Sequence, residues 1–143
     1  MLDWDGIHGI RHWMRVRDNG IRLAKLTGAD LGVVEFFAFL HDSQRRNEWK
    51  DVGHGARAAE FVSRLRRLFT TLGDREFEHL VFACRFHSDG LIRADITVQT
   101  CWDADRLDLG RVGKRPNPEF LCTSAAKEES MIEWAYKRSK EGV

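Results

Sequence analysis

Apolar residues in this sequence recur at steps of three and four, the spacing that places side chains on one face of an α-helix. Ile7, Ile10, Trp13 and Met14 show this spacing near the N-terminus. The chain contains only two prolines, both near its C-terminal end, so long stretches have no helix-breaking residue. We therefore expect an all-α fold, a compact bundle of about six helices that forms a single domain over residues 1–143.

Candidate caps and turn sequences divide the chain into the expected helices. Their bounds are residues 4–16, ended by Asp18-Asn19-Gly20; 31–40, capped by Asp30; about 54–69; 74–87, capped by Asp74; 95–109; and about 124–140. The segment 95–109 begins with β-branched residues that favour a strand, but the spacing of Cys101, Ala104 and Asp108 suits a helix. We take it as a helix.

The composition of the chain limits which binding partners and which cellular compartment we expect. Hydrophobic residues make up 43% of the chain, enough for a core without disulfides. The chain has 23 Lys and Arg residues and 22 Asp and Glu residues, so its net charge is near zero. This charge does not indicate a long polyanion as partner, and we do not expect the protein to bind nucleic acid. The three cysteines lack a Cys-x-x-Cys pair, and the chain shows neither a basic leader nor an apolar run of roughly 18 residues. We expect a cytoplasmic protein with no membrane partner, and the oligomeric state stays open.

The placement of the histidines points to a metal site. The chain has six histidines, and five of them lie where an expected helix begins or ends, or share a helix face at a spacing of four, near other potential ligands. Divalent metals bind neutral imidazoles and carboxylates, which a helical bundle can direct inward from several helices. The His41-Asp42 pair is the strongest indication, because it follows a buried helix and its carboxylate has two oxygens that can bridge two ions.

Three ordered motifs carry a family resemblance. They are His12-Trp13-Met14-Arg15-Val16, the His41-Asp42 dyad, and the segment 103–108, which reads Asp-Ala-Asp-Arg-Leu-Asp. Together they resemble the His-x-x-Arg-Val opening, the namesake dyad and the Ala-Asp-Arg-Leu ending of HD-domain phosphohydrolases. The resemblance covers residues 8–113 as the metal-site core, with the helix at about 124–140 packing on it. It implies four metal ligands, His12, His41, Asp42 and Asp105, with Asp105 preferred to Asp103 because it precedes the Arg-Leu pair.

Two further histidines extend the resemblance. His54, at the start of an expected helix, and His87, in a His-Ser-Asp-Gly sequence, are similar to histidines of the multi-metal branches of this family. One or two divalent ions (Mn, Fe, Co, Ni, Zn or Mg) would then be bound, with Asp42 as the bridging ligand. No Gly-Tyr-Pro follows His87 and no Glu-Asp pair follows Asp42. These departures argue against the hydrolases of cyclic-di-GMP and of guanosine tetraphosphate.

The resemblance implies hydrolysis of a small phosphate ester, with a nucleotide as the favoured substrate, by water that the metal activates. Asp42 would be catalytic as the bridging ligand. Arg45 and Arg46, just after the dyad, would supply planar forks for phosphate oxygens, and two arginines near Asp105 are further candidates.

Alternatives to this interpretation stay open. His8 shares a helix face with His12 and is expected to contact a ligand or the substrate rather than the metal. No proton donor for the leaving group can be named from the sequence, so a non-catalytic, metal-binding HD domain that acts as a regulatory or interaction module is the second hypothesis. A nuclease is a third, disfavoured by the near-neutral charge.

Overall fold

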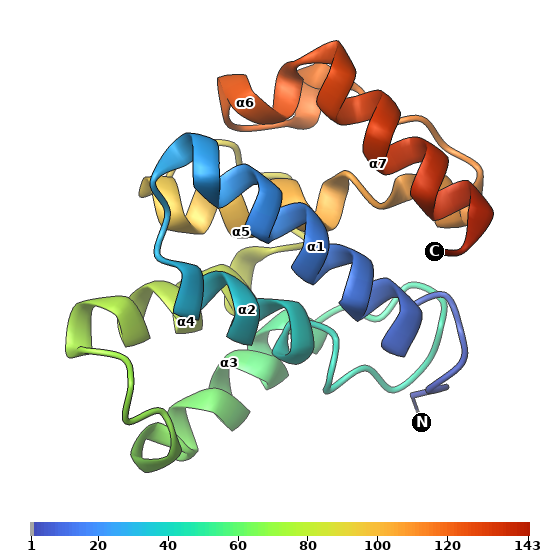
Figure 1. Cartoon of the computed structure of the whole chain (residues 1–143). Helices are drawn as coiled ribbons and strands as arrows, with labels where there is room; N and C mark the ends of the chain where they lie inside the picture. Colours follow the sequence, from blue (N-terminus) through green and yellow to red (C-terminus); the bar gives the residue numbers. More distant parts are fainter. Residues whose placement is uncertain (1) are drawn as a thin grey trace.

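A computed structural model describes residues 2–143, and the regular elements in that range are all helices (Figure 1). Among these residues the α-helices are α1 (Ile10–Thr27), α2 (Leu31–Leu40), α3 (His54–Arg64), α4 (Asp74–Phe86), α5 (Ile96–Arg106), α6 (Ser124–Lys127) and α7 (Glu129–Glu141). Short 3-10 turns, including η1 (Arg66–Leu68) and η2 (Leu109–Val112), lie between them. The expected all-α fold is confirmed.

Helix α1 lies in the middle of the arrangement and packs against both α2 and α5 (Figure 1). Helix α4 contacts α2 and α5, and α3 packs along α4. On the opposite side of α1 from α3, α7 contacts α1 and the turn η2. Residues that lie far apart in the sequence therefore meet where α1, α2, α4 and α5 come together.

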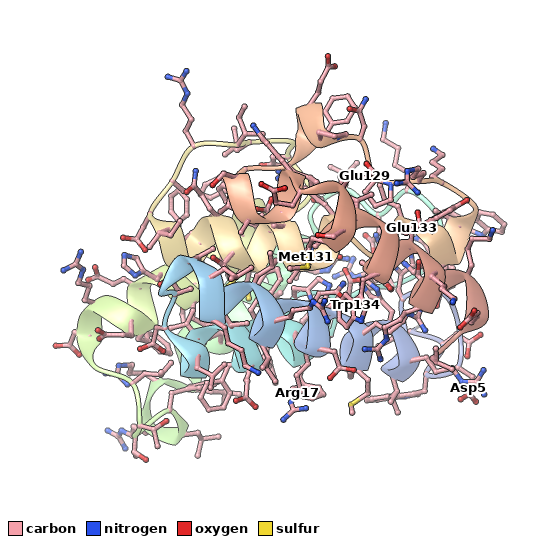
Figure 2. All side chains as sticks on the ribbon, turned by 45° about the horizontal axis from the view of Figure 1, so that its top comes forward. Asp5, Arg17, Glu129, Met131, Glu133 and Trp134 are labelled. Atoms are coloured by element: carbon pink, nitrogen blue, oxygen red, sulfur yellow. The ribbon has the colours of Figure 1, made fainter. Side chains whose placement is uncertain are left out.

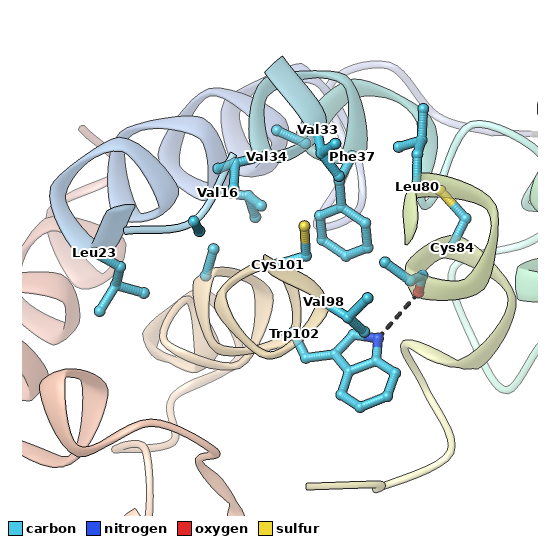
Figure 3. Close-up of a cluster of buried hydrophobic side chains, with 14 of the residues drawn as sticks. Val16, Leu23, Val33, Val34, Phe37, Leu80, Cys84, Val98, Cys101 and Trp102 are labelled. Atoms are coloured by element: carbon cyan, nitrogen blue, oxygen red, sulfur yellow. Dashed lines mark hydrogen bonds between the residues drawn. The ribbon is translucent and has the colours of Figure 1, made fainter. Parts of the chain in front are cut away.

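A shared apolar core holds these helices in register (Figure 3). Phe37 of α2, Leu80 of α4 and Trp102 of α5 are completely buried in it. The indole Nε1 of Trp102 donates a hydrogen bond to the backbone carbonyl of Ala83 at 3.0 Å, which ties α5 to α4. The satisfied indole and the close packing leave little freedom for α4 and α5 to shift relative to each other.

Helix α1 differs most from expectation, because Asp18-Asn19-Gly20 lies inside it rather than ending it. The structure gives each residue a tertiary role. The Asn19 amide donates to the Ala104 carbonyl at 2.9 Å, and Gly20 lies so close to α2 that an added Cβ would come within 2.3 Å of the Val34 side chain. A sequence typical of a turn therefore forms the crossing point of three helices, and α1 continues until Gly28, which has a left-handed backbone conformation.

Helices α3 and α4 differ from expectation at single boundaries. Helix α3 ends at Arg64 rather than near Phe69, and η1 follows. The Arg66 side chain donates to the carbonyls of Phe69 and Leu72, which stabilises this tighter turn. The N-cap of α4 is Gly73, so the expected cap Asp74 is the first helical residue, where its charge still favours the helix dipole.

The expected C-terminal helix is interrupted at Glu128, whose ψ of 133° is extended. The break follows from burial. Ala126 and Met131 are both buried, yet five residues of continuous helix would turn them about 140° apart. The interruption lets both face the core, while Glu129 and Glu133 of α7 remain exposed (Figure 2). None of the helices in residues 2–143 has the length and apolar character required to cross a membrane.

Candidate metal centre

The structure brings together all six residues for which the sequence predicts metal binding. They come from five elements: His12 from α1, His41 and Asp42 from the end of α2, His54 from the start of α3, His87 from the end of α4, and Asp105 from α5. The four histidines and Asp42 are at most 4% exposed, and the Asp105 side chain is 15% exposed. The expected metal ligands therefore form one buried cluster between helices.

Four side chains form what we call the first donor group: His12, His41, Asp42 and Asp105. The two imidazole Nε2 atoms are 3.2 Å apart. Asp42 Oδ2 lies 3.4 Å from Nε2 of His12 and 3.3 Å from that of His41, and Asp105 Oδ1 lies 3.2 and 3.4 Å from the same two atoms. Neighbouring ligand atoms around an ion with bonds of about 2.0–2.2 Å are separated by about 3.0–3.5 Å, so this spacing suits a common ion.

The second donor group consists of Asp42, His54 and His87. Nε2 of His54 and Nε2 of His87 are 2.8 Å apart, and they lie 3.2 and 3.3 Å from Asp42 Oδ1. Asp42 thus directs one carboxylate oxygen to each donor group. This is the arrangement that a carboxylate adopts when it bridges two adjacent cation positions.

Each of the four imidazoles has its other nitrogen, Nδ1, held by an acceptor. The partners are the Asp108 carboxylate for His12 (2.7 Å) and the backbone carbonyls of Phe37 for His41 (3.0 Å), Asp51 for His54 (2.7 Å) and Cys84 for His87 (2.7 Å). Since carbonyls and carboxylates only accept hydrogen bonds, Nδ1 must carry a proton in every case. In the neutral imidazole the remaining Nε2 then presents a lone pair, as a metal-binding histidine does.

These lone pairs explain why the cluster suits a cation. In each donor group two imidazole nitrogens and at least one carboxylate oxygen face one another within 3.4 Å. All of these atoms are acceptors when the histidines are neutral, so their mutual approach is unfavourable unless a positive charge lies among them. Imidazole nitrogen and carboxylate oxygen are also the ligands of zinc, iron, manganese and related divalent ions. The donor set therefore fits the divalent metal that the sequence predicts.

The pKa values of the clustered side chains show that a proton can provide the positive charge among these acceptors in place of a metal ion. Burial by itself lowers the pKa of His41, but the charges of Asp42 and Asp105 outweigh it and raise the pKa to about 10. Burial likewise opposes ionisation of Asp42 and Asp105, yet the charge of His41 and hydrogen bonds with His12 hold the pKa of both carboxyls well below the usual value. Protons and a metal ion therefore compete for the same positions.

Sequence reasoning missed the role of Asp108. This carboxylate is fully buried, accepts from His12 Nδ1 at 2.7 Å, and accepts from Arg15 Nε at 2.7 Å. It fixes the ring orientation and the tautomer of His12, and Arg15 balances its charge. The available signal was the third acidic residue of the Asp-Ala-Asp-Arg-Leu-Asp segment, together with the rule that a metal-binding imidazole requires a partner for its second nitrogen.

His8 lies beside the cluster and contacts Asp42, one of the predicted ligands. Its Nδ1 is 3.3 Å from Asp42 Oδ2, and its backbone N–H donates to Glu48 Oε2 at 3.2 Å. Glu48 belongs to the segment 43–53 between α2 and α3, which also supplies Asp51, the carbonyl partner of His54. This segment therefore contacts the second donor group through Asp51, and through Glu48 it contacts His8 beside Asp42.

The arginines proposed for phosphate binding lie at different distances from the cluster. Arg45 Nε donates to Asp42 Oδ1 at 3.2 Å, whereas the exposed Arg46 side chain lines a surface cleft outside it. Arg106 and Arg111 bind the backbone carbonyls of Phe120 and Ile7. Arg45 thus donates directly to a predicted ligand, and Arg111 acts on His12 through its charge.

Asp103, to which we preferred Asp105 as a predicted metal ligand, lies apart from the cluster. Its carboxylate accepts from the backbone N–H groups of Cys122 and Thr123 and from the Thr123 hydroxyl. It thus anchors the segment before α6 rather than contributing a donor to the cluster.

Comparison with known proteins supports the family resemblance at the level of the fold. The structure is similar to a crystal structure described as a predicted HD superfamily hydrolase from an uncultured Thermotogales bacterium, with a TM-score of 0.72 and 28% sequence identity. The match covers 96% of this chain and 78% of that one. Models of known protein families and curated proteins give no match. This structural neighbour confirms the expected resemblance to HD-superfamily hydrolases, whereas no family model matches the three sequence motifs.

Proposed function

We propose that this chain, which shares the fold of an HD-superfamily hydrolase, is a divalent-metal-dependent phosphohydrolase that acts on a small phosphate ester, with a nucleotide as the favoured substrate. The observation that carries the proposal is the convergence of four imidazole Nε2 atoms and two carboxylates, with every Nδ1 held by an acceptor. Residues that serve only packing have no reason to place so many acceptors face to face.

In this proposal the first donor group (His12, His41, Asp42, Asp105) and the second (Asp42, His54, His87) would hold the metal. A bound divalent ion supplies a Lewis acid that neutralises phosphate oxygens and lowers the pKa of a coordinated water toward about 7. Asp42 serves both groups, because its two oxygens face different sets of imidazoles. Asp108 holds His12 in the orientation that directs Nε2 into the first group.

Substrate binding would use the cleft beside the second donor group. This cleft has a volume of about 260 Å³, and the residues that line it include Arg45 and Lys50, the acidic Asp51 and Asp89, and Trp49, His54 and Ser88. Its two cationic side chains suit phosphate oxygens, and the exposed indole of Trp49 offers a flat surface to a base or another planar group. The small volume favours a compact ester over a polymer. Arg46, on the neighbouring cleft, would attract the anionic substrate from outside.

A substrate panel tests the proposal. Phosphomonoesters, phosphodiesters and nucleoside triphosphates are assayed with added Mn²⁺, Co²⁺ or Mg²⁺, in the native protein and in His41→Gln. We expect turnover of at least one small ester, and its loss in His41→Gln. The matched control is His79→Gln, which removes a histidine of α4 whose ring lies near Asp95, away from the cluster. Activity that survives in His41→Gln, or is lost equally in both variants, would contradict the assignment.

A second candidate function is a metal-binding module without turnover, which acts as a regulatory or interaction domain. The burial of the donor atoms favours it, since Asp42 is only 2% exposed and the segment 43–53 lies against the cluster. If the protein binds a divalent ion but hydrolyses no ester in the panel, this second function is the better description.

We also propose a cytoplasmic location. Cys84, Cys101 and Cys122 are all free thiols, and the first two are buried. Unpaired cysteines are typical of proteins in a reducing compartment.

A further inference from the structure

We propose that Arg45 limits the centre to one tightly held ion, because its guanidinium supplies the positive charge that a second ion would otherwise bring to the second donor group. This inference rests on the proposed function. It assigns the first donor group as the tight site and the second as a weak one. Arg45 then acts as a positioning residue that sets metal stoichiometry.

The contacts of Arg45 place its charge against the second donor group. Its Nε donates to Asp42 Oδ1 at 3.2 Å, and this is the same oxygen that lies 3.2 Å from His54 Nε2 and 3.3 Å from His87 Nε2. Asp42 Oδ2, which faces the first donor group, lies near His8 instead. The charge of the guanidinium therefore repels an ion in the second donor group more strongly than an ion in the first.

Arg45 is also held in place. Its side chain is only 10% exposed, and its Nη1 donates to the backbone carbonyls of Asn47 at 3.3 Å and Trp49 at 3.0 Å. These carbonyls belong to the segment that covers the second donor group. Because the guanidinium binds Asp42 on one side and two backbone carbonyls on the other, moving it away from Asp42 would break several hydrogen bonds. A second ion cannot displace this charge without disturbing the segment 43–53.

The balance of charges leads to the same conclusion. The first donor group contains two carboxylates, Asp42 and Asp105, which match the charge of one divalent ion. The second group adds two imidazoles and shares its carboxylate, Asp42, with the first, and Asp105 lies within 4.8 Å of a His87 nitrogen. The nearby Asp51 is already paired with Arg57 at 2.7 Å. A second dication would therefore share the two carboxylates that already balance the first ion, and it would lie beside a fixed cation.

The expected effect follows from Coulomb's law. Even with the dielectric constant of water, a dication about 5 Å from a guanidinium loses roughly tenfold in affinity, and partial burial increases the loss. We therefore expect the native protein to bind one ion tightly and the second at least about tenfold more weakly.

Titration of the stripped, full-length protein with Mn²⁺ tests the inference. Calorimetry gives the number and affinity of the ions, and electron paramagnetic resonance detects coupling between two neighbouring Mn²⁺ ions. In Arg45→Gln we expect the second ion to bind about tenfold or more tightly than in the native protein, and the first to be unchanged. The control Arg67→Gln removes a cation from the exposed turn η1 and should leave both steps as in the native protein.

Arg45→Lys separates the effect of the positive charge from the effect of the hydrogen bonds between Arg45 and the segment 43–53. Lysine keeps the positive charge but cannot reproduce the fork, so we expect weak second-ion binding as in the native protein. If Arg45→Lys instead behaves like Arg45→Gln, the charge argument is wrong. Two equally tight ions in the native protein, or no gain in Arg45→Gln, would also overturn the inference.

A further variant keeps the test decisive if Arg45→Gln does not fold. His54→Ala in the otherwise native chain should abolish only the weak step, and loss of the tight step would contradict the assignment of sites. A native protein that binds no ion would instead refute the proposed function itself, so the two failures are distinguishable.

Discussion

Among single residues, Asp108 has the clearest effect on the centre without being a donor to it. Its carboxylate accepts from His12 Nδ1 and from Arg15 Nε, each at 2.7 Å, in a fully buried position. We expect Asp108→Asn to weaken metal binding by about 10- to 100-fold, because the amide has no charge and cannot hold the His12 tautomer as firmly. Competition with a coloured chelator measures the change in metal affinity.

Asp103→Asn is the matched control for this prediction. Asp103 is as buried as Asp108, but its carboxylate binds Cys122 and Thr123 rather than a histidine. We expect this variant to lower the free energy of unfolding and to leave metal affinity intact. If both variants lost metal affinity equally, the effect of Asp108→Asn would come from lower stability of the fold and not from the contact between Asp108 and His12.

The contacts of single residues also show which parts of the site a sequence reveals. The donor residues could be named because each lies in a short motif, such as the adjacent His41 and Asp42. The structure brings them together, while their role as ligands stays a prediction. The partner of His12 was not named, although Asp108 is the third acidic residue of the segment 103–108, because the sequence alone does not say which histidine its carboxylate meets. Arg45 was proposed for phosphate, and its contact with Asp42 Oδ1 was not foreseen.

At the scale of elements, the crossing of α1 and α2 depends on Gly20. An added Cβ would come within 2.3 Å of Val34 Cγ1. We expect Gly20→Ala to lower the free energy of unfolding by about 1–3 kcal/mol, although alanine at an uncrowded helical position would stabilise by about 0.5–1 kcal/mol. Urea unfolding of the single variants and of the pair with Val34→Ala measures the coupling, and the pair should recover part of the loss. A stabilised Gly20→Ala protein would contradict the close crossing.

Elements were predicted well where local chemistry decides. Asp30 caps α2 as predicted, because its side chain accepts a hydrogen bond from the backbone N–H of Val33. Asp95 caps α5 in the same way, although we did not predict it as a cap from the sequence. The predicted helix end at Asp18-Asn19-Gly20 was wrong, because these three residues contact α2, α5 and α7 and do not form a turn. Asp18, for example, pairs with Arg138 of α7 at 2.9 Å. Local sequence determines where a helix can end, and tertiary packing determines whether it does.

For the whole molecule, the buried charges predict how stability depends on pH. His41 has a pKa of about 10 in the folded, metal-free protein against a usual 6.5, so the stability it contributes is fully present below pH 6.5 and is lost as the pH rises toward 10. Asp42 and Asp105 have lowered pKa values, so their contribution is present above the usual carboxyl pKa and is lost as the pH falls.

A bound ion should remove the alkaline loss. The ion requires neutral imidazoles, so it replaces the proton of His41 and binds more tightly as the pH rises. We expect the free energy of unfolding in the presence of a chelator to be lower at pH 9 than at pH 6, and this decline to be reduced or absent with Mn²⁺. An equal decline under both conditions would mean that the ion does not bind at these histidines.

We propose above that the cluster around Asp42 holds a divalent metal. Elemental analysis of the native protein and of Asp42→Asn, each loaded with Mn²⁺ and freed of excess ion, tests it most directly. Asparagine keeps the size of the side chain but lacks the charge that serves both donor groups. We expect about one or two ions per native chain, depending on how much of the weakly held ion the removal step leaves, and a loss of bound metal in the variant. A native protein without metal, or a variant that retains the full amount, would contradict it.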